Sequence, residues 1–277
     1  MTPSNDGPFA GGTAVVTGGG SGLGRALAHR FADEGMHVVV ADLDVGNART
    51  VADELPQASA HRVDVGDPAS IQELADAVGS VEGDLQVLCA NVGVQQINTL
   101  DALSADDWRW LVGVNVLGTV ATVDAFLPQL RAASGLRRIL LTTSTSATYA
   151  APRLGAYTAS KYAVLGYGET LRLELAAEGI GVTMLLPGGM ATTHLASSAA
   201  ARPAAIGPSG TTDDDIAAIS AATVLGPDDI ATPEHASRHV VEALIEDRPY
   251  LVTHGSTPAA IRERFEAITT AFARANE

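Results

Sequence analysis

The chain has 277 residues and a formal net charge of −15, with 46% hydrophobic and 18% charged residues. This composition is typical of a soluble globular protein with a substantial core, and the acidic charge argues against nucleic acids and anionic membrane surfaces as partners, because both recruit basic patches. One α/β domain commonly fills this length and no linker divides the chain, so we expect a single domain over residues 1–277 with a flexible N-terminus at 1–8.

Several classes of protein are disfavoured by what the sequence lacks. We find no apolar run of about 18 residues, and MTPSNDGPF at the N-terminus lacks the basic start and hydrophobic stretch of a secretory signal, so we expect a cytoplasmic protein. Cys89 is the only cysteine, and its apolar surroundings favour a core residue over a reactive thiol. The seven histidines form no HxxxH or Cys/His cluster, so we expect no metal and no zinc-dependent alcohol dehydrogenase mechanism.

The first predicted elements are a strand at 13–17, a glycine-rich turn, a helix to about Asp33 and a second strand at 37–41. The glycines of the turn are Gly18, Gly22 and Gly24. Glycine lets the backbone turn sharply and lets a pyrophosphate approach the N-terminus of the helix, as in dinucleotide-binding βαβ units. No lysine follows these glycines, which disfavours a phosphate-transferring P-loop. A glycine-rich turn without a ligand is the alternative.

Asp42 ends the second strand, eighteen residues after Gly24. A carboxylate at this place accepts hydrogen bonds from the ribose 2′-OH of NAD and repels the 2′-phosphate of NADP. Neither Ser21 in the glycine turn nor Leu43 offers a cation to that phosphate. We therefore predict NAD as the cofactor, while the alternative role for an acid here, capping the next helix, fits Asp44 better.

Strand and helix patterns alternate through the rest of the chain. This order predicts an α/β fold of the Rossmann type, a doubly wound parallel sheet with helices on both faces and ligands at the C-terminal ends of the strands. We predict further strands at 60–65, 85–90, 138–143, 182–186 and 250–253, and helices at 68–78, 105–132 and 233–245, with one helix after Ser144 and one at the C-terminus.

Tyr157 and Lys161 stand one helical turn apart, with Ser144 thirteen positions before the tyrosine at the end of a predicted strand. A lysine cation within about 4–6 Å favours a phenolate and lowers the pKa of a tyrosine from its usual value of about 10. A tyrosine that exchanges a proton and a serine that anchors the substrate oxygen are what an alcohol–ketone interconversion requires. Taken alone, this YxxxK pattern could be accidental.

These motifs together resemble the short-chain dehydrogenase/reductase family along nearly the whole chain. TGGGSGLG resembles its TGxxxGxG cofactor loop, CANVG its NNAG segment, PGGMAT its PGxxxT segment, and Ser144, Tyr157 and Lys161 its catalytic serine and YxxxK motif. Asn115 matches the family's helix asparagine, which the resemblance implies holds a water that links the lysine to solvent. Ala90 and Val92 depart from the family pattern, and Val92 adds bulk below the nicotinamide pocket.

The resemblance implies a catalytic set of Asn115, Ser144, Tyr157 and Lys161. It also implies a set of residues that bind the cofactor, in which Asp64 lies near the adenine and 187–192 at the nicotinamide carboxamide. The cofactor residues we expect are Gly18, Ser21, Gly22, Leu23, Gly24, Asp42, Leu43, Asp64, Val65, Asn91, Gly93, Tyr157, Lys161, Pro187, Gly188, Met190 and Thr192.

Residues 188–227 break the strand–helix rhythm and are rich in Ala, Ser, Thr, Gly and Pro. Such a segment is usually a lid or disordered, and its place after the nicotinamide motif favours a lid that orders on ligand binding. Its THLASSAAARPAAIG stretch is similar to the lid of bacterial family members that oxidise benzylic alcohols. We expect the lid and its surroundings to line the substrate pocket with Val94, Gln95, Ser144, Ser146, Tyr149, Leu154, Met190, His194 and Leu195.

Because these residues are mostly apolar, we expect a small-molecule substrate that is a hydrophobic secondary alcohol or ketone, aryl or alicyclic. We interpret His194 as a surface residue of the lid rather than as a second base. The alternatives are a dinucleotide-binding redox sensor without turnover, a methyltransferase, or a reductase of another carbonyl such as a 3-oxoacyl or sugar-derived ketone. The last helix carries an apolar stripe at Ile261, Phe265, Ile268 and Phe272, which we expect to pack on its own domain or on another subunit. The family resemblance implies a homodimer or homotetramer.

Overall fold

The structure, a computed structural model, describes residues 7–79, 83–192, 194–222, 230–255 and 258–275. Its centre is a parallel seven-stranded sheet in the order β3-β2-β1-β4-β5-β6-β9. The strands are β1 (Thr13–Thr17), β2 (His37–Asp42), β3 (Ala58–Arg62), β4 (Leu85–Ala90), β5 (Arg137–Thr142), β6 (Ile180–Leu186) and β9 (Tyr250–Val252). The predicted Rossmann-type fold is confirmed.

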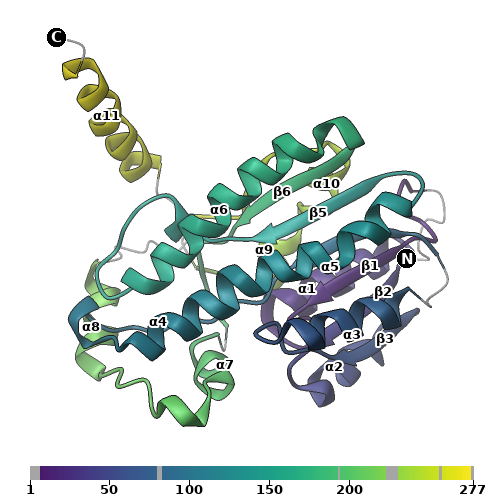
Figure 1. Cartoon of the computed structure of the whole chain (residues 1–277), viewed down its shortest axis with the longest axis horizontal. Coiled ribbons are helices and arrows are strands. Elements are labelled where there is room, and N and C mark those ends of the chain that lie inside the picture. Colours follow the sequence, from purple (N-terminus) through teal and green to yellow (C-terminus); the bar gives the residue numbers. More distant parts are fainter. Residues whose placement is uncertain (1–6, 80–82, 193, 223–229, 256–257, 276–277) are drawn as a thin grey trace.

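Helices pack on both faces of the sheet (Figure 1). One face is covered by α3 (Pro68–Val78), α5 (Gly118–Ala132) and α6 (Gly155–Leu175). The other is covered by α1 (Gly22–Asp33), α2 (Val45–Ala52), α9 (Pro233–Ser237) and α10 (Val240–Ile245). Outside these layers lie α4 (Ala105–Val112), α7 (His194–Ala201), α8 (Asp213–Ala222), α11 (Pro258–Arg274) and the short parallel pair β7 (Gly189–Met190) and β8 (Ile230–Ala231).

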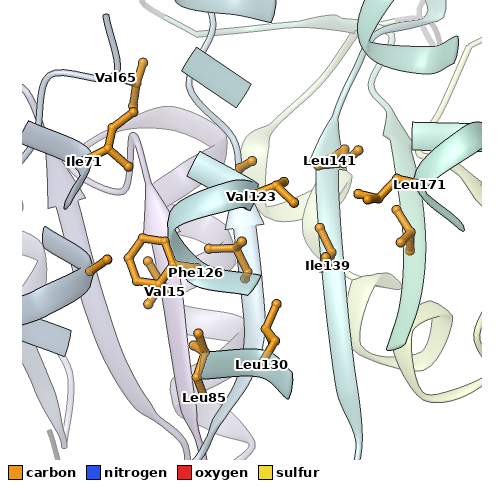
Figure 2. Packing of buried hydrophobic residues seen from close by; sticks show 14 of the residues in the cluster. Val15, Val65, Ile71, Leu85, Val123, Phe126, Leu130, Ile139, Leu141 and Leu171 are labelled. Atoms are coloured by element: carbon orange, nitrogen blue, oxygen red, sulfur yellow. The ribbon is translucent and has the colours of Figure 1, made fainter. Parts of the chain in front are cut away.

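The period-two alternation of the strands divides the core into two layers. On β1, Val15 faces the helices α3, α5 and α6, whereas Ala14 and Val16 face α1 and α10. Figure 2 shows the first layer, in which Phe126 of α5 lies over Val15 of β1. Because every residue of β1, β4 and β6 is buried, these strands read as nearly continuous apolar runs, as expected for a parallel sheet covered on both sides.

Side-chain caps start several helices where the sequence predicts them. Asp44 accepts hydrogen bonds from the backbone N–H groups of Gly46 and Asn47, which confirms it as the N-cap of α2. Ser104 and Asp107 form a reciprocal capping box at the start of α4.

The structure corrects three element boundaries. The strand predicted at 60–65 is β3 at Ala58–Arg62, because Val63 and Val65 enter the core beyond the last residue paired with β2. The single helix predicted at 105–132 contains a π-helical turn at Gly113–Leu117 between α4 and α5. The helix predicted at 233–245 is divided into α9 and α10.

The same segment, Ala105–Ala132, is long and apolar enough to cross a membrane by length and composition alone, a test that the core helix of an α/β domain also passes. Its hydrophobic side chains have another partner. Val123, Phe126 and Leu130 are buried against the sheet, which is where the core helix of an α/β domain places its apolar face.

Helix α11 extends away from the sheet (Figure 1). None of its side chains, all within the described part of the chain, is buried, and Phe265 and Phe272 of the predicted apolar stripe are 54% and 70% exposed. Its contact with the body of the domain includes Arg264, whose guanidinium lies 5.0 Å from the ring centroid of Tyr162 on α6.

We expect Phe126→Ala to destabilise the protein by about 3–5 kcal/mol, because it removes a fully buried ring from the centre of the first core layer. The matched change Leu173→Ala, at a side chain that is 79% exposed on α6, should cost less than about 0.5 kcal/mol. Urea unfolding of both variants measures the difference, and equal losses would contradict this account of the core.

Candidate active site

The segments that follow four neighbouring strands meet at one edge of the sheet. Because β1, β4, β5 and β6 are adjacent and parallel, the residues after their C-terminal ends lie side by side. These residues are the glycine turn after β1, Asn91 after β4, Ser144 after β5 and Pro187 after β6. This edge is where doubly wound sheets bind their ligands.

Lys161 is held in a buried position between α6 and the sheet. Its side chain is 3% exposed, and Nζ donates a hydrogen bond of 2.9 Å to the carbonyl oxygen of Thr142 at the end of β5. Nζ also lies 5.7 Å from the centroid of the Tyr157 ring, one turn earlier on α6. The structure therefore brings together the tyrosine and lysine that the YxxxK spacing pairs.

Burial dominates the electrostatics of this pair. It lowers the pKa of Lys161 to about 8, because the ammonium has lost its water. Burial also raises the pKa of Tyr157, and the Ser144 side chain beside it acts in the opposite direction. Our prediction that the pKa of Tyr157 is lowered is therefore wrong, because desolvation of the phenolate is the largest effect.

Asn115 lies in the π-helical turn between α4 and α5 and is fully buried. Its Oδ1 accepts a hydrogen bond from the N–H of Val94 at 2.7 Å, and its Nδ2 donates to the Val94 carbonyl and to the Ser160 hydroxyl, both at 2.9 Å. Ser160 in turn donates to the backbone carbonyl of Tyr157 at 2.7 Å. Asn115 thus ties the segment after β4 to the catalytic helix, and a π-helical turn is a common feature of such sites.

Ser160 is a site residue that the sequence analysis missed. It is 1% exposed and bonds both Asn115 and Tyr157. The only signal in the sequence is a serine directly before Lys161, and a helix serine more often bonds its own backbone.

The glycine turn has the shape of a pyrophosphate cradle. Gly18 and Gly22 have φ angles of +66° and +50°, which side chains rarely allow, and a Cβ on Gly24 would lie 1.9 Å from the Gly18 carbonyl oxygen. Gly22 opens toward Thr192, whose Cγ2 lies 3.9 Å from where its Cβ would be. At the N-cap of α1, the Ser21 side chain makes no capping bond, so the first N–H groups of that helix are available to an anion.

Asp42 contacts this turn directly. Its Oδ2 accepts from the N–H of Gly20 at 2.9 Å and its Oδ1 from the N–H of Asp44 at 3.0 Å. A carboxylate has about four acceptor positions, so capacity remains for ribose hydroxyls. The next side chain, Leu43, is 40% exposed and carries no charge. These residues fit an adenosine whose ribose has a free 2′-OH.

The other predicted cofactor residues line the same edge. Asn91 joins two strands through Nδ2, which donates to the Thr17 carbonyl at 3.2 Å, and Oδ1, which accepts from the Thr142 hydroxyl at 2.9 Å. A Cβ on Gly93 would lie 2.9 Å from Nζ of Lys161, so a larger residue at this position would displace the ammonium. Asp64 binds the N–H of Gly66 through Oδ1, and Val65 after it is buried. Val92 packs against Gly18, where a Cβ would meet its Cγ2 at 3.2 Å.

Around Tyr157 the structure brings together a mostly apolar cluster from both the sheet edge and residues 188–222. Leu154 and Leu195, both predicted pocket residues, pack there. Ser144 and Ser146 lie at the same turn, where the N–H of Ser146 donates to Ser144 Oγ at 3.1 Å. Tyr149 is partly buried in the same loop. Ile97, Ile216 and Ile219 also belong to the cluster and were missed. For the two isoleucines of α8, nothing in the low-complexity segment marks which residues turn inward.

Two predicted pocket residues point elsewhere. The Val94 side chain packs with Leu111 and Ala156, so it supports α4 and not the space above Tyr157. Met190 packs against the core layer that contains α1 and α10. Gln95 contributes its backbone N–H to the Ser198 hydroxyl at 3.0 Å.

His194 is not the surface residue that we interpreted it as. Its ring packs edge-on against Tyr157, with 6.4 Å between the centroids and 61° between the planes. Burial and then the Lys161 cation lower the pKa of this histidine to about 4, so its imidazole is neutral at physiological pH.

A buried ion pair anchors the segment that follows α7 and was also missed. Arg202 NH2 lies 2.5 Å from Oδ1 of Asp107 on α4, and NH1 donates to Gln96 Oε1 at 2.8 Å. The charged side chains are only 6% and 7% exposed. Arginine in an Ala-rich segment gives no sequence signal for a partner 95 residues away.

Among the described residues, no three His, Cys, Asp or Glu side chains lie close enough together to hold a metal ion.

A family profile described as short chain dehydrogenase matches residues 12–203. The 1-deoxy-11-beta-hydroxypentalenate dehydrogenase of Streptomyces exfoliatus is 31% identical over 261 residues, which are 92% of this chain and 87% of that protein. The D-threitol dehydrogenase of Mycolicibacterium smegmatis is 34% identical over 178 residues, 63% of this chain and 68% of its own.

A solved short chain dehydrogenase/reductase from Burkholderia phymatum, in complex with NAD, superimposes with a TM-score of 0.87 at 33% identity and covers 96% of both chains. The profile spans well over half of the chain, and the Streptomyces relative and the Burkholderia structure each match more than nine tenths of it. The chain therefore belongs to the short-chain dehydrogenase/reductase family.

Proposed function

We propose that this protein is an NAD-dependent oxidoreductase that interconverts a hydrophobic secondary alcohol, aryl or alicyclic, and its ketone. The observation that carries the proposal is the buried cluster of Ser144, Tyr157 and Lys161 beside an open glycine cradle. The dehydrogenases among its relatives and the NAD complex of its structural neighbour support it. Retention of all four catalytic residues disfavours a sensor without turnover, and a methyltransferase needs no YxxxK motif.

The chain's own residues divide the chemistry among them. Bound NAD would accept the hydride that leaves the carbinol carbon of the alcohol. The Tyr157 oxygen takes the proton of the substrate hydroxyl during oxidation and returns it during reduction. Ser144 holds the substrate oxygen. Lys161 places a positive charge near the Tyr157 ring, and the hydrogen bond to the Thr142 carbonyl fixes the position of its ammonium. Asn115 keeps the turn after β4 in register with α6.

The glycine turn and Asp42 would hold the adenosine and pyrophosphate, and Pro187, Gly188 and Thr192 the nicotinamide end. We propose that residues 188–227 act as a lid over the substrate. Leu195, Ile216 and Ile219 support this, because they cover Tyr157. Residues 223–227 lie outside the described part of the chain. The apolar cover favours a hydrophobic substrate over a sugar-derived ketone, and a 3-oxoacyl ketone is the second candidate.

We also propose self-association into a homodimer or homotetramer in the cytoplasm. The exposed apolar stripe of α11, with Phe265 and Phe272, supports a partner surface, because contiguous exposed apolar side chains mark interaction sites. The acidic charge of −15 supports the absence of nucleic acid and membrane partners.

Replacing both Asp42 by Ala and Leu43 by Arg should shift preference from NAD toward NADP, because a repelling carboxylate gives way to a guanidinium fork that binds phosphate. Ratios of kcat/KM for the two cofactors measure the shift. Asp53→Ala, which removes an exposed carboxylate at the end of α2, serves as the control and should leave the ratio unchanged. Equal use of both cofactors by the unaltered protein would overturn the assignment.

Tyr157→Phe should lower NAD-dependent turnover by at least about 10²-fold and leave NAD binding intact, because the ring remains and only the proton acceptor is lost. Absorbance at 340 nm with a panel of aryl and alicyclic alcohols gives the rate. Tyr162→Phe, which removes a hydroxyl from the same helix beside Arg264, is the control. Oxidation requires the deprotonated tyrosine, whose pKa burial raises, so its rate should rise with pH, and reduction should show the opposite trend.

Lys161→Met should abolish most activity and yet stabilise the fold. The pKa of Lys161 is about 8 in the folded chain and 10.5 when exposed, so between these values the unfolded chain binds more protons and stability rises with pH. Below pH 8 the whole cost of burying the ammonium is present. At about 1.4 kcal/mol per pH unit, Met removes about 3 kcal/mol of this cost at pH 7.

Thermal unfolding of the wild type and Lys161→Met from pH 6.5 to 9.5 measures this difference. The advantage of the variant should be constant up to about pH 8 and shrink above it. A variant less stable than the wild type at pH 7 would show that the buried ammonium stabilises the fold.

A further inference from the structure

His194 stands directly over the catalytic tyrosine. It is the first residue of α7, and its N–H donates to the Thr192 hydroxyl at 3.2 Å, next to the glycine cradle. Its imidazole meets the Tyr157 ring edge-on with 6.4 Å between centroids. In a substrate whose oxygen reaches the Tyr157 hydroxyl, the atoms next to that oxygen therefore lie near this imidazole.

The imidazole is a polar group in apolar surroundings. The residues that pack around Tyr157 include Ile97, Leu154, Leu195, Ile216 and Ile219. Within the described part of the chain, the imidazole of His194 makes no hydrogen bond and no ion pair; only its backbone does. The residue is only partly buried, so a ligand atom can reach the ring and exchange a hydrogen bond with it.

The position of His194 is fixed by the fold. Ser198, one turn later on α7, is 1% exposed and accepts a hydrogen bond from the Gln95 N–H. Arg202, just after the helix, is bonded to both Asp107 and Gln96. A polar group held on an anchored helix recognises a substrate atom more selectively than one on a free loop.

The charge of the imidazole narrows the chemistry of its partner. Burial and the Lys161 cation keep it neutral, with a pKa of about 4. A carboxylate would be recognised best by an imidazolium, which this site disfavours. A neutral imidazole exchanges hydrogen bonds with uncharged oxygens, either as donor or as acceptor.

We propose that His194 is a specificity-determining residue that hydrogen-bonds a second, uncharged oxygen of the substrate, a hydroxyl or carbonyl on the carbon next to the reacting one. The substrate class is then an apolar secondary alcohol with a vicinal oxygen. This inference rests on the proposed oxidoreductase function and adds to it the reason for a polar group in the lid.

The test compares matched probes that differ by one hydroxyl: 1-phenylethanol against 1-phenyl-1,2-ethanediol, and cyclohexanol against trans-1,2-cyclohexanediol. The diol-to-monool ratio of kcat/KM should fall about tenfold in His194→Phe, the scale of one lost hydrogen bond. His194→Gln, which keeps a donor and an acceptor, should recover part of the ratio. Leu195→Ala alters the same cover without removing a polar group, so it should affect both probes alike. A fall of less than threefold in His194→Phe overturns the proposal.

A second readout separates this proposal from the oxidoreductase function. Histidine NMR of the protein with NADH, with the His194 signal assigned by its loss in His194→Phe, should show that signal shifting with the diol and not with the monool. If no probe is oxidised but the diol shifts the signal, the proposed reaction fails and the His194 contact stands. If the probes are oxidised and both shift the signal equally, or neither does, the reaction stands and the His194 proposal fails.

Discussion

A cation buried between a helix and a sheet is the constraint on which the site depends. Lys161 has lost nearly all its solvent, and the carbonyl of Thr142 and the ring of Tyr157 face its ammonium in place of water. An incompletely compensated charge in the interior is unfavourable. Its neighbours are correspondingly constrained: a side chain on Gly93 would displace the ammonium, and the Lys161 cation helps to lower the pKa of His194. The end of β5, the turn after β4, helix α6 and the first residue of α7 thus all lie near one charged group.

The parts of the fold that could be predicted are those whose cause is local in sequence. Valine-rich strands, the glycine turn and the Asp44 cap each follow from a few adjacent residues, and they agree with the structure. One turn of helix separates Tyr157 from Lys161, so their pairing also follows from spacing. The upward shift of the Tyr157 pKa could not be predicted from spacing, because it depends on how much water the surrounding side chains remove. Sequence spacing shows which residues are close, but not how deeply they are buried.

The lid shows the opposite case. Its Ala- and Ser-rich sequence has little periodicity, and its folded path is determined by partners distant in the chain. Arg153 pairs with Asp215 at 3.0 Å, and Ser198 bonds the backbone of Gln95. Such contacts leave no local trace, so His194 was predicted on the surface although it packs on Tyr157. Residues of this kind could be found from sequence only by asking which polar side chains in an apolar segment lack a local partner.

The Arg202–Asp107 pair connects the segment after α7 to the candidate active site through α4, the helix that carries Asp107. A buried ion pair adds less stability than apolar packing would, but it allows one arrangement of its two elements because a shifted lid would leave a charge unpaired. Asp107 also closes the capping box of α4, which leads without a break into the π-helical turn that holds Asn115. From Arg202 the contacts therefore run through Asp107 and α4 to Asn115, and from there through Ser160 to the backbone of Tyr157. Helix α7 also contacts the same tyrosine through the ring of His194, so residues 194–202 reach Tyr157 both directly and through the Arg202–Asp107 pair.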